Sequence, residues 1–104
     1  LCNESIYPMT LVNCYPIGVI KMVDSGALDE KIIAIPFKDP TYNGYYDIQE
    51  LPKHIFEEMM HFFEVYKSLE HKKTTVKEIA HREEAVDIIK KCIAMYAEKF
   101  GGAR

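Results

Sequence analysis

Two runs rich in β-branched residues, separated by a turn-like stretch, constrain the fold of this chain more than any other sequence feature. The first run, residues 16–23, is apolar on both faces except at Lys21. The second, residues 31–36, ends at a proline, which cannot donate to a strand ladder. Residues 24–30 between them contain Asp, Ser and Gly, which are typical of turns. The pattern predicts two strands joined as a hairpin over about residues 16–36.

Two stretches of helical periodicity follow a predicted loop at residues 37–50. We expect one helix over about residues 52–69, with Pro52 as its first residue and one broad apolar face buried. The residues of that face are Ile55, Phe56, Met59, Met60, Phe62, Phe63, Tyr66 and Leu69. A short strand is expected at residues 74–79. A second helix is expected over about residues 83–100, where Gly101 and Gly102 end it.

Composition supports a globular α+β unit and disfavours several classes of partner. Apolar residues make up 48% of the 104 residues and charged residues 28%, as in ordinary folded domains. The net charge of −3 disfavours nucleic acid as a partner, because phosphate binding needs a basic field. No apolar run approaches the roughly 20 residues that would span a bilayer. We therefore expect neither a nucleic-acid nor a membrane partner.

The cysteines and histidines suggest no metal centre. Cys2, Cys14 and Cys92 lack zinc-binding spacing, and their odd number disfavours a disulfide framework. We expect Cys92 to be a small core residue of the second helix, in a reduced cytoplasmic protein. The four histidines are expected to be solvated on helix faces or in loops, and they are His54, His61, His71 and His81.

The predicted hairpin turn is the first candidate site. Asp24 and Asp29 lie at its two shoulders, and Lys31 shares the side of Asp29 because strand side chains alternate. Two carboxylates suit Mg²⁺, and an adjacent lysine suits a phosphate. The residues alone leave an alternative open, since turn aspartates commonly bond the local backbone and strand-end lysines are commonly solvated.

Tyr66 and Lys67 form the second candidate site. Tyr66 belongs to the apolar helix face, so its ring should be buried with its hydroxyl at the edge, beside the Lys67 ammonium. Such a pair can hold a phosphate. A snorkelling lysine next to a core tyrosine explains the same pattern. The loop aromatics Tyr42, Tyr45 and Tyr46 are expected to pack over the hairpin.

Three ordered segments carry a family resemblance. Residues 17–24 and 29–36, residues 46–52, and residues 61–67 resemble, in order and spacing, the family I soluble inorganic pyrophosphatases. The similarity extends from about residue 8 to Phe100. It implies Mg²⁺-dependent hydrolysis of inorganic diphosphate to two phosphates, with Asp24 and Asp29 as metal ligands. It also implies that Lys31, Tyr66 and Lys67 hold phosphate oxygens.

One departure from the family pattern matters for activity. The family's acidic motif, Asp-x-Asp-Pro-x-Asp, supplies further metal ligands and the general base, and it is not among these 104 residues. The resemblance therefore implies that residues 1–104 are the C-terminal part of a pyrophosphatase domain. This part would be a hairpin from an incomplete OB-like β-barrel packed with two α-helices, without a catalytic base of its own. We expect little activity from it alone, and a homo-oligomer in solution.

Two competing hypotheses are retained. The chain could be a non-catalytic structural or interaction module that keeps the pyrophosphatase scaffold. The second competing hypothesis is an OB-like domain that binds oligonucleotides. Such a domain needs a basic groove lined with aromatic side chains, which disagrees with the net negative charge of this chain.

Overall fold

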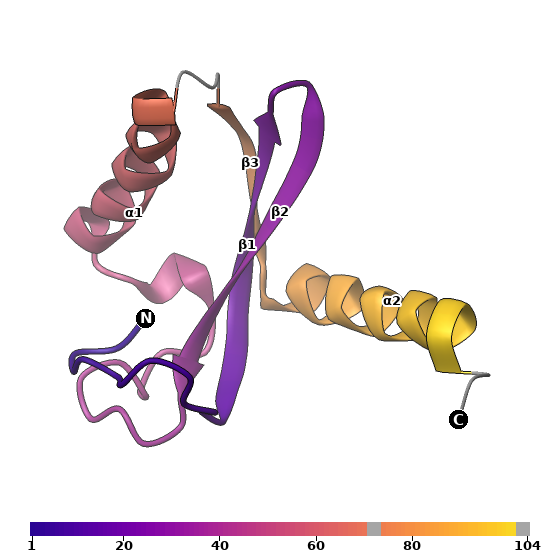
Figure 1. The fold of residues 1–104 in the computed structure, drawn as a ribbon. Coiled ribbons are helices and arrows are strands. Elements are labelled where there is room, and N and C mark those ends of the chain that lie inside the picture. The colour runs from indigo at the N-terminus through magenta and orange to yellow at the C-terminus, as the bar shows by residue number, and fades with distance from the viewer. Residues whose placement is uncertain (71–73, 102–104) are drawn as a thin grey trace.

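The computed structural model describes residues 1–70 and 74–101, apart from the side chains of residues 67, 70 and 74. The described strands form one antiparallel sheet in the order β2-β1-β3, with α1 on one side and α2 on the other (Figure 1). This arrangement confirms the α+β class. The elements are β1 (Cys14–Asp24), β2 (Ala27–Pro36), η1 (Ile48–Glu50), α1 (Lys53–Val65), η2 (Tyr66–Glu70), β3 (Thr74–His81) and α2 (Arg82–Phe100).

The hairpin is tighter than the sequence predicted. Asp24 pairs with Ala27, so the turn consists of Ser25 and Gly26 alone. Both turn residues have positive φ, 52° and 84°, which is the conformation that matches a two-residue turn to the twist of its strands. The predicted turn over residues 24–30 was therefore wrong at its C-terminal side, and Asp29 lies inside β2 instead of at a loop shoulder.

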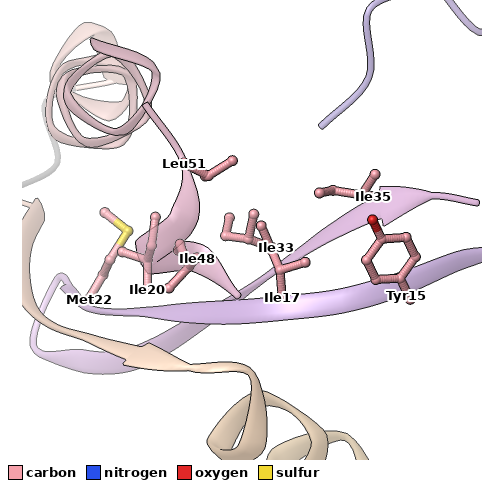
Figure 2. Close-up of a cluster of buried hydrophobic side chains, with 8 residues drawn as sticks. All are labelled: Tyr15, Ile17, Ile20, Met22, Ile33, Ile35, Ile48 and Leu51. Atoms are coloured by element: carbon pink, nitrogen blue, oxygen red, sulfur yellow. The ribbon is translucent and has the colours of Figure 1, made fainter. Parts of the chain in front are cut away.

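The main core lies between the sheet and the segment that leads into α1. Figure 2 shows its side chains on the face of the sheet toward η1. The pairing register shifts between Pro16 and Gly18, so Ile17 and Ile20 reach the same core although they are three residues apart. The buried residues of this core are Tyr15, Ile17, Ile20, Met22, Ile33, Ile35, Ile48 and Leu51.

Gly18 allows η1 to approach β1 closely. A Cβ atom at this position would lie 2.7 Å from the Cβ and Cγ2 atoms of Ile48 and 2.9 Å from the carbonyl oxygen of Ala80. These contacts are shorter than packed carbon atoms tolerate. The absence of a side chain at Gly18 therefore lets the loop after β2 cover the sheet.

Among the described residues, the beginning of α2 covers the opposite face of the sheet. Val19, Ala80 and Ala85 form a small buried cluster, and the Lys21 ammonium lies 2.8 Å from a Glu84 carboxylate oxygen. That hydrogen bond is the main reason why the pKa of Lys21 is raised. Beyond residue 89 the helix leaves the sheet (Figure 1) and its side chains are exposed. The prediction of a buried Cys92 was wrong for this reason.

Helix α1 confirms the first predicted helix, with local differences. Pro52 is its N-cap, one position before the first helical residue, and α1 continues as the 3-10 helix η2 after Val65. Ile55, Met59 and Phe63 pack against the main core. Phe62 and Leu69 are exposed, contrary to prediction. Phe62 is exposed because the sheet covers only part of the apolar face of α1. Leu69 is exposed because it lies in the 3-10 helix η2, whose period differs from that of an α-helix.

The other predicted elements have mixed outcomes. The strand expected at residues 74–79 is confirmed and extends to His81, and α2 confirms the second helix, with Gly101 as its C-cap. The loop aromatics Tyr42 and Tyr45 pack against the core, whereas Tyr46 is exposed.

No helix of the described residues is both long enough and apolar enough to cross a membrane.

Asp47 joins η1 to the start of α2. One carboxylate oxygen accepts hydrogen bonds from the Gln49 amide and lies 2.9 Å from His81 Nδ1, while the other accepts from the Arg82 amide at 2.9 Å. Burial tends to raise the pKa of this carboxyl, but the hydrogen bonds from Arg82, Gln49 and His81 outweigh it and lower the pKa. Asp47 and Glu50 also form a capping box.

The histidines agree with the expectation of solvation except at one position. His54 and His61 are exposed on α1, and His71 lies outside the described residues. The ring of His81 is exposed, but it is bonded to Asp47 at the end of a strand, so the expected helix or loop position was wrong.

We expect Gly18→Ala to lower the free energy of unfolding by about 1–3 kcal/mol, because the new methyl group overlaps Ile48 and backbone. Urea denaturation of the protein measures the change. Gly44→Ala is the matched control, since its Cβ would meet no atom within 4 Å. Equal stability of the two variants would contradict the close approach of η1 to β1.

We expect Asp47→Ala to lower stability at pH 7 by about 1–2 kcal/mol, in the range of a lost helix cap. Because its pKa is lowered in the folded state, Asp47 stabilises the fold above its ordinary pKa, and this contribution is lost as the pH falls through the lower folded value. The stability difference from the unsubstituted protein should therefore shrink below about pH 4. Asp87→Ala on the exposed side of α2 serves as the control. A difference that stays constant down to pH 2 would refute the assignment.

Candidate active site

The register of the hairpin places three candidate residues on one face of the sheet. Asp29 lies opposite Met22, and Lys31 lies opposite Ile20, so both side chains project on the side of the main core and α1. Asp24 follows Met22 by two residues and therefore shares this face. The three side chains form a diagonal row from the hairpin tip toward α1.

Asp29 and Lys31 form the centre of this row. The Lys31 Nζ atom lies 2.8 Å from a carboxylate oxygen of Asp29, and the two side chains are 27% and 28% exposed. The pKa of Lys31 is raised, mainly by its hydrogen bond to Asp29. Partial burial tends to lower this pKa, whereas the charge of Asp29 and the neighbouring Tyr66 raise it further. Lys31 therefore carries a positive charge at neutral pH in a partly desolvated place.

Tyr66 approaches the row from the end of α1. Its half-buried ring stacks on Phe62 with the centroids 5.1 Å apart and meets Phe63 edge-on at 6.3 Å. Its electrostatic effect on Lys31 places it beside the ammonium group. The sequence predicted a buried ring with its hydroxyl at the edge, and the ring is only half-buried, because Phe62, on which it stacks, is itself exposed. The Lys67 side chain lies outside the described part of the structure, although its backbone belongs to η2.

Phe63 is a site residue that the sequence analysis assigned only to the core. The Lys31 Nζ atom lies 5.9 Å from the centroid of its ring, which is within the range of a cation–π contact. The spacing of Phe63 and Tyr66, three residues apart on a helix, signals that the two rings are neighbours. Only the tertiary structure brings the Lys31 ammonium over the Phe63 ring and near Tyr66.

Asp24 occupies the hairpin tip. One of its carboxylate oxygens lies 3.4 Å from the Ser25 hydroxyl oxygen, and the side chain is half-buried. Asp24 and Asp29 offer hard oxygen ligands of the kind that Mg²⁺ takes, commonly one or two carboxylates completed by water and phosphate oxygens. Within residues 1–70 and 74–101, no three acidic, histidine or cysteine side chains gather as a complete metal-holding group. The two carboxylates are therefore of the donor type that Mg²⁺ takes, but they do not by themselves form a metal-holding group among the described residues.

Comparisons with known proteins agree on one family. A family model described as inorganic pyrophosphatase matches residues 1–97. The chain is 41% identical over 100 residues to soluble inorganic pyrophosphatase 2 of Chlamydomonas reinhardtii. The aligned region covers 96% of this chain and 52% of the relative. It is 38% identical to the inorganic pyrophosphatase of Halalkalibacterium halodurans, covering 92% of this chain and 59% of the relative.

Solved structures give the same result for the fold. The inorganic pyrophosphatase of Helicobacter pylori superposes with a TM-score of 0.86 at 36% identity, over 92% of this chain and 58% of that chain. The enzyme from Thermus thermophilus also gives 0.86, at 29% identity, over 92% of this chain and 57% of that chain. The chain thus spans about half the length of the curated relatives it matches.

Proposed function

Because this chain belongs to the inorganic pyrophosphatase family, we propose that it supplies part of the active site of a Mg²⁺-dependent inorganic diphosphatase. The proposed reaction is the hydrolysis of diphosphate to two phosphates. The observation that supports it is that Lys31, which is bonded to the Asp29 carboxylate, also interacts with Tyr66 at the end of α1. A carboxylate suits Mg²⁺, and an ammonium and a hydroxyl group suit phosphate oxygens.

Lys31 is proposed to bind a phosphate oxygen. An ammonium group acts on phosphate as a compact point charge, and the raised pKa of Lys31 keeps it charged at neutral pH. Its contact with Asp29 does not prevent this role. A carboxylate has about four lone-pair sites, so Asp29 can accept from Lys31 and still offer oxygen to a cation.

Tyr66 and Lys67 are proposed to bind diphosphate from the side of α1. The rings of Phe62 and Phe63 fix the ring of Tyr66, so its hydroxyl can donate to a phosphate oxygen with little loss of side-chain freedom. Lys67, the next residue, would add a second positive charge. The two lysines would then offset part of the high negative charge of the substrate, and Tyr66 would donate a hydrogen bond to it.

Asp24 and Asp29 are proposed as ligands of Mg²⁺. When bound, the ion supplies charge neutralisation for the departing phosphate and lowers the pKa of the attacking water. We assign the general base to none of residues 1–104. The three cysteines are free and exposed, which favours a reducing compartment and supports a cytoplasmic location.

Self-association of the protein is a further part of the proposal. Large apolar side chains are exposed along the N-terminal segment and at the end of β2, including Tyr7, Met9, Leu11 and Phe37. Surfaces of this kind commonly bind other proteins. They support a homo-oligomer built through this region.

A non-catalytic module is the second candidate function. The observations that favour it are the coverage of about half of each relative and the partial donor set for a metal. The two functions differ in one measurable respect, because only the first predicts that Asp29 and Lys31 affect phosphate release.

In the native protein, we expect Lys31→Met to lower kcat for Mg²⁺-dependent phosphate release by about 100-fold, as for other lost electrostatic contacts to a reacting group. Asp29→Asn should also lower the rate. Glu30→Gln is the matched control, because Glu30 lies between them on β2 but projects from the opposite face. Unchanged kinetics in Lys31→Met and Asp29→Asn would favour the non-catalytic module.

Residues 1–104 as a separate polypeptide should release little phosphate from diphosphate and Mg²⁺. Two carboxylates cannot fix several metal ions and also supply a base. A colorimetric phosphate assay with the purified chain tests this expectation. Turnover at the rate of the relatives, abolished by Asp24→Asn, would show that the described residues suffice for catalysis.

A further inference from the structure

The ring of Phe63 lies next to both candidate phosphate-binding groups that the structure describes. The Lys31 Nζ atom lies 5.9 Å from the centroid of this ring, and the Tyr66 ring meets it edge-on with the centroids 6.3 Å apart. Lys31 comes from β2, whereas Phe63 belongs to α1 and Tyr66 begins η2. Phe63 therefore stands where the sheet and the helix end bring their polar groups together.

The main core holds Phe63 in place. Its partly buried side chain packs against that core, as do Ile55 and Met59 from the same helix. Its ring also meets the Phe62 ring edge-on, with the centroids 5.3 Å apart. A packed ring has few rotamers available to it, so Phe63 offers a fixed surface to a longer and more flexible neighbour.

The Lys31 side chain is a neighbour of that kind. Its ammonium group lies at the end of a flexible four-carbon stem, and ordering such a stem costs free energy. The hydrogen bond of 2.8 Å to Asp29 holds the ammonium from one side. A carboxylate that is shared with a cation would hold it less strongly, since the two positive charges repel each other.

An aromatic face can hold the ammonium without this conflict. The ring attracts a positive charge through its quadrupole, yet it is neutral and is not a ligand for a metal ion. It also accepts no conventional hydrogen bond, so the N–H groups of Lys31 keep their capacity to donate to oxygen atoms. The Phe63 ring can thus fix the position of Lys31 and leave its charge available to a substrate.

We propose that Phe63 is a positioning residue for diphosphate hydrolysis, whose ring face holds the Lys31 ammonium beside Tyr66. This inference rests on the proposed function, because it needs Lys31 to bind a phosphate oxygen. Phe63 itself touches no substrate and acts through Lys31. A group misplaced by about 1 Å can cost on the order of 100-fold in rate, so a side chain without polar atoms can still matter to the reaction.

In the native protein, Phe63→Leu should lower kcat for Mg²⁺-dependent phosphate release by about tenfold, which is the weight of one partly desolvated cation–π contact. Phe56→Leu is the matched control. Phe56 also lies on α1 and packs against the main core, but it is about 10 Å along the helix axis from Phe63. Both variants should lose comparable stability in urea, whereas the control should keep its kcat within about twofold.

A double-mutant cycle separates positioning from packing. When Lys31→Met is already present, Phe63→Leu should lower kcat by less than about twofold, because the group that Phe63 positions is gone. A residue that only supports the fold would lower kcat by the same factor in both backgrounds. The cycle therefore gives different results for the two roles.

A ring-trifluorinated phenylalanine at position 63 is the second variant. It nearly keeps the shape of the side chain but weakens the negative charge on the ring face. It should lower kcat about threefold or more and leave stability in urea nearly unchanged. Proton NMR adds a readout without turnover, because the ε-methylene protons of Lys31 should shift when Phe63→Leu removes the ring.

Four results would overturn the proposal and leave the proposed function intact, provided that Lys31→Met slows phosphate release. They are an unchanged kcat in Phe63→Leu, an equal loss in both backgrounds of the cycle, an equal loss in Phe56→Leu, and an unchanged kcat with the fluorinated ring. If Lys31→Met leaves phosphate release unchanged, the proposed function fails first, and Phe63 has no binding group to position.

Discussion

The antiparallel pairing of β1 with β2 is the interaction on which the rest of this structure depends. The turn of Ser25 and Gly26 sets its register, because both residues adopt the positive φ angles of a two-residue hairpin. A slip of one residue would move every side chain of β2 to the other face. Asp29 and Lys31 would then leave the side of α1, and Ile33 and Ile35 would leave the core.

β1 is buried on both faces, and a register shift in its pairing with β2 helps one core to collect its side chains. The register shift near Ile17 turns three apolar side chains of β1, Ile17, Ile20 and Met22, into one core, while Val19 serves the other face. η1 covers the first core because Gly18 permits its close approach to β1, and side chains of α1 pack against the same core. The Asp47 carboxylate then joins η1 to the β3–α2 junction by hydrogen bonds. An element on one face of the sheet is thus bonded to the start of the helix on the other face.

The candidate site combines side chains from two paired strands with one side chain from the end of a helix. Asp29 and Lys31 project from paired strands, whereas Tyr66 comes from the point where α1 becomes a 3-10 helix. Phe63 supports both parts, since it contacts the Tyr66 ring and lies under the Lys31 ammonium. Among the described residues, the far half of α2 takes no part in this site, and its apolar side chains Ile93, Tyr96 and Phe100 are exposed.

The sequence by itself determined the hairpin, both helices and the family, because periodicity, turn residues and ordered motifs are local properties of the chain. It also identified Asp29 and Lys31 as neighbours, since alternation along one strand requires no tertiary information. It misplaced the end of the turn and the burial of Cys92 and Phe62. An apolar stripe shows which face of a helix can be buried. How much of that face is covered depends on the size of the surface of this chain that packs against the helix. The meeting of Lys31 with Phe63 and Tyr66, and of Asp47 with His81, was decided by the tertiary structure alone, because these contacts join residues more than 30 positions apart.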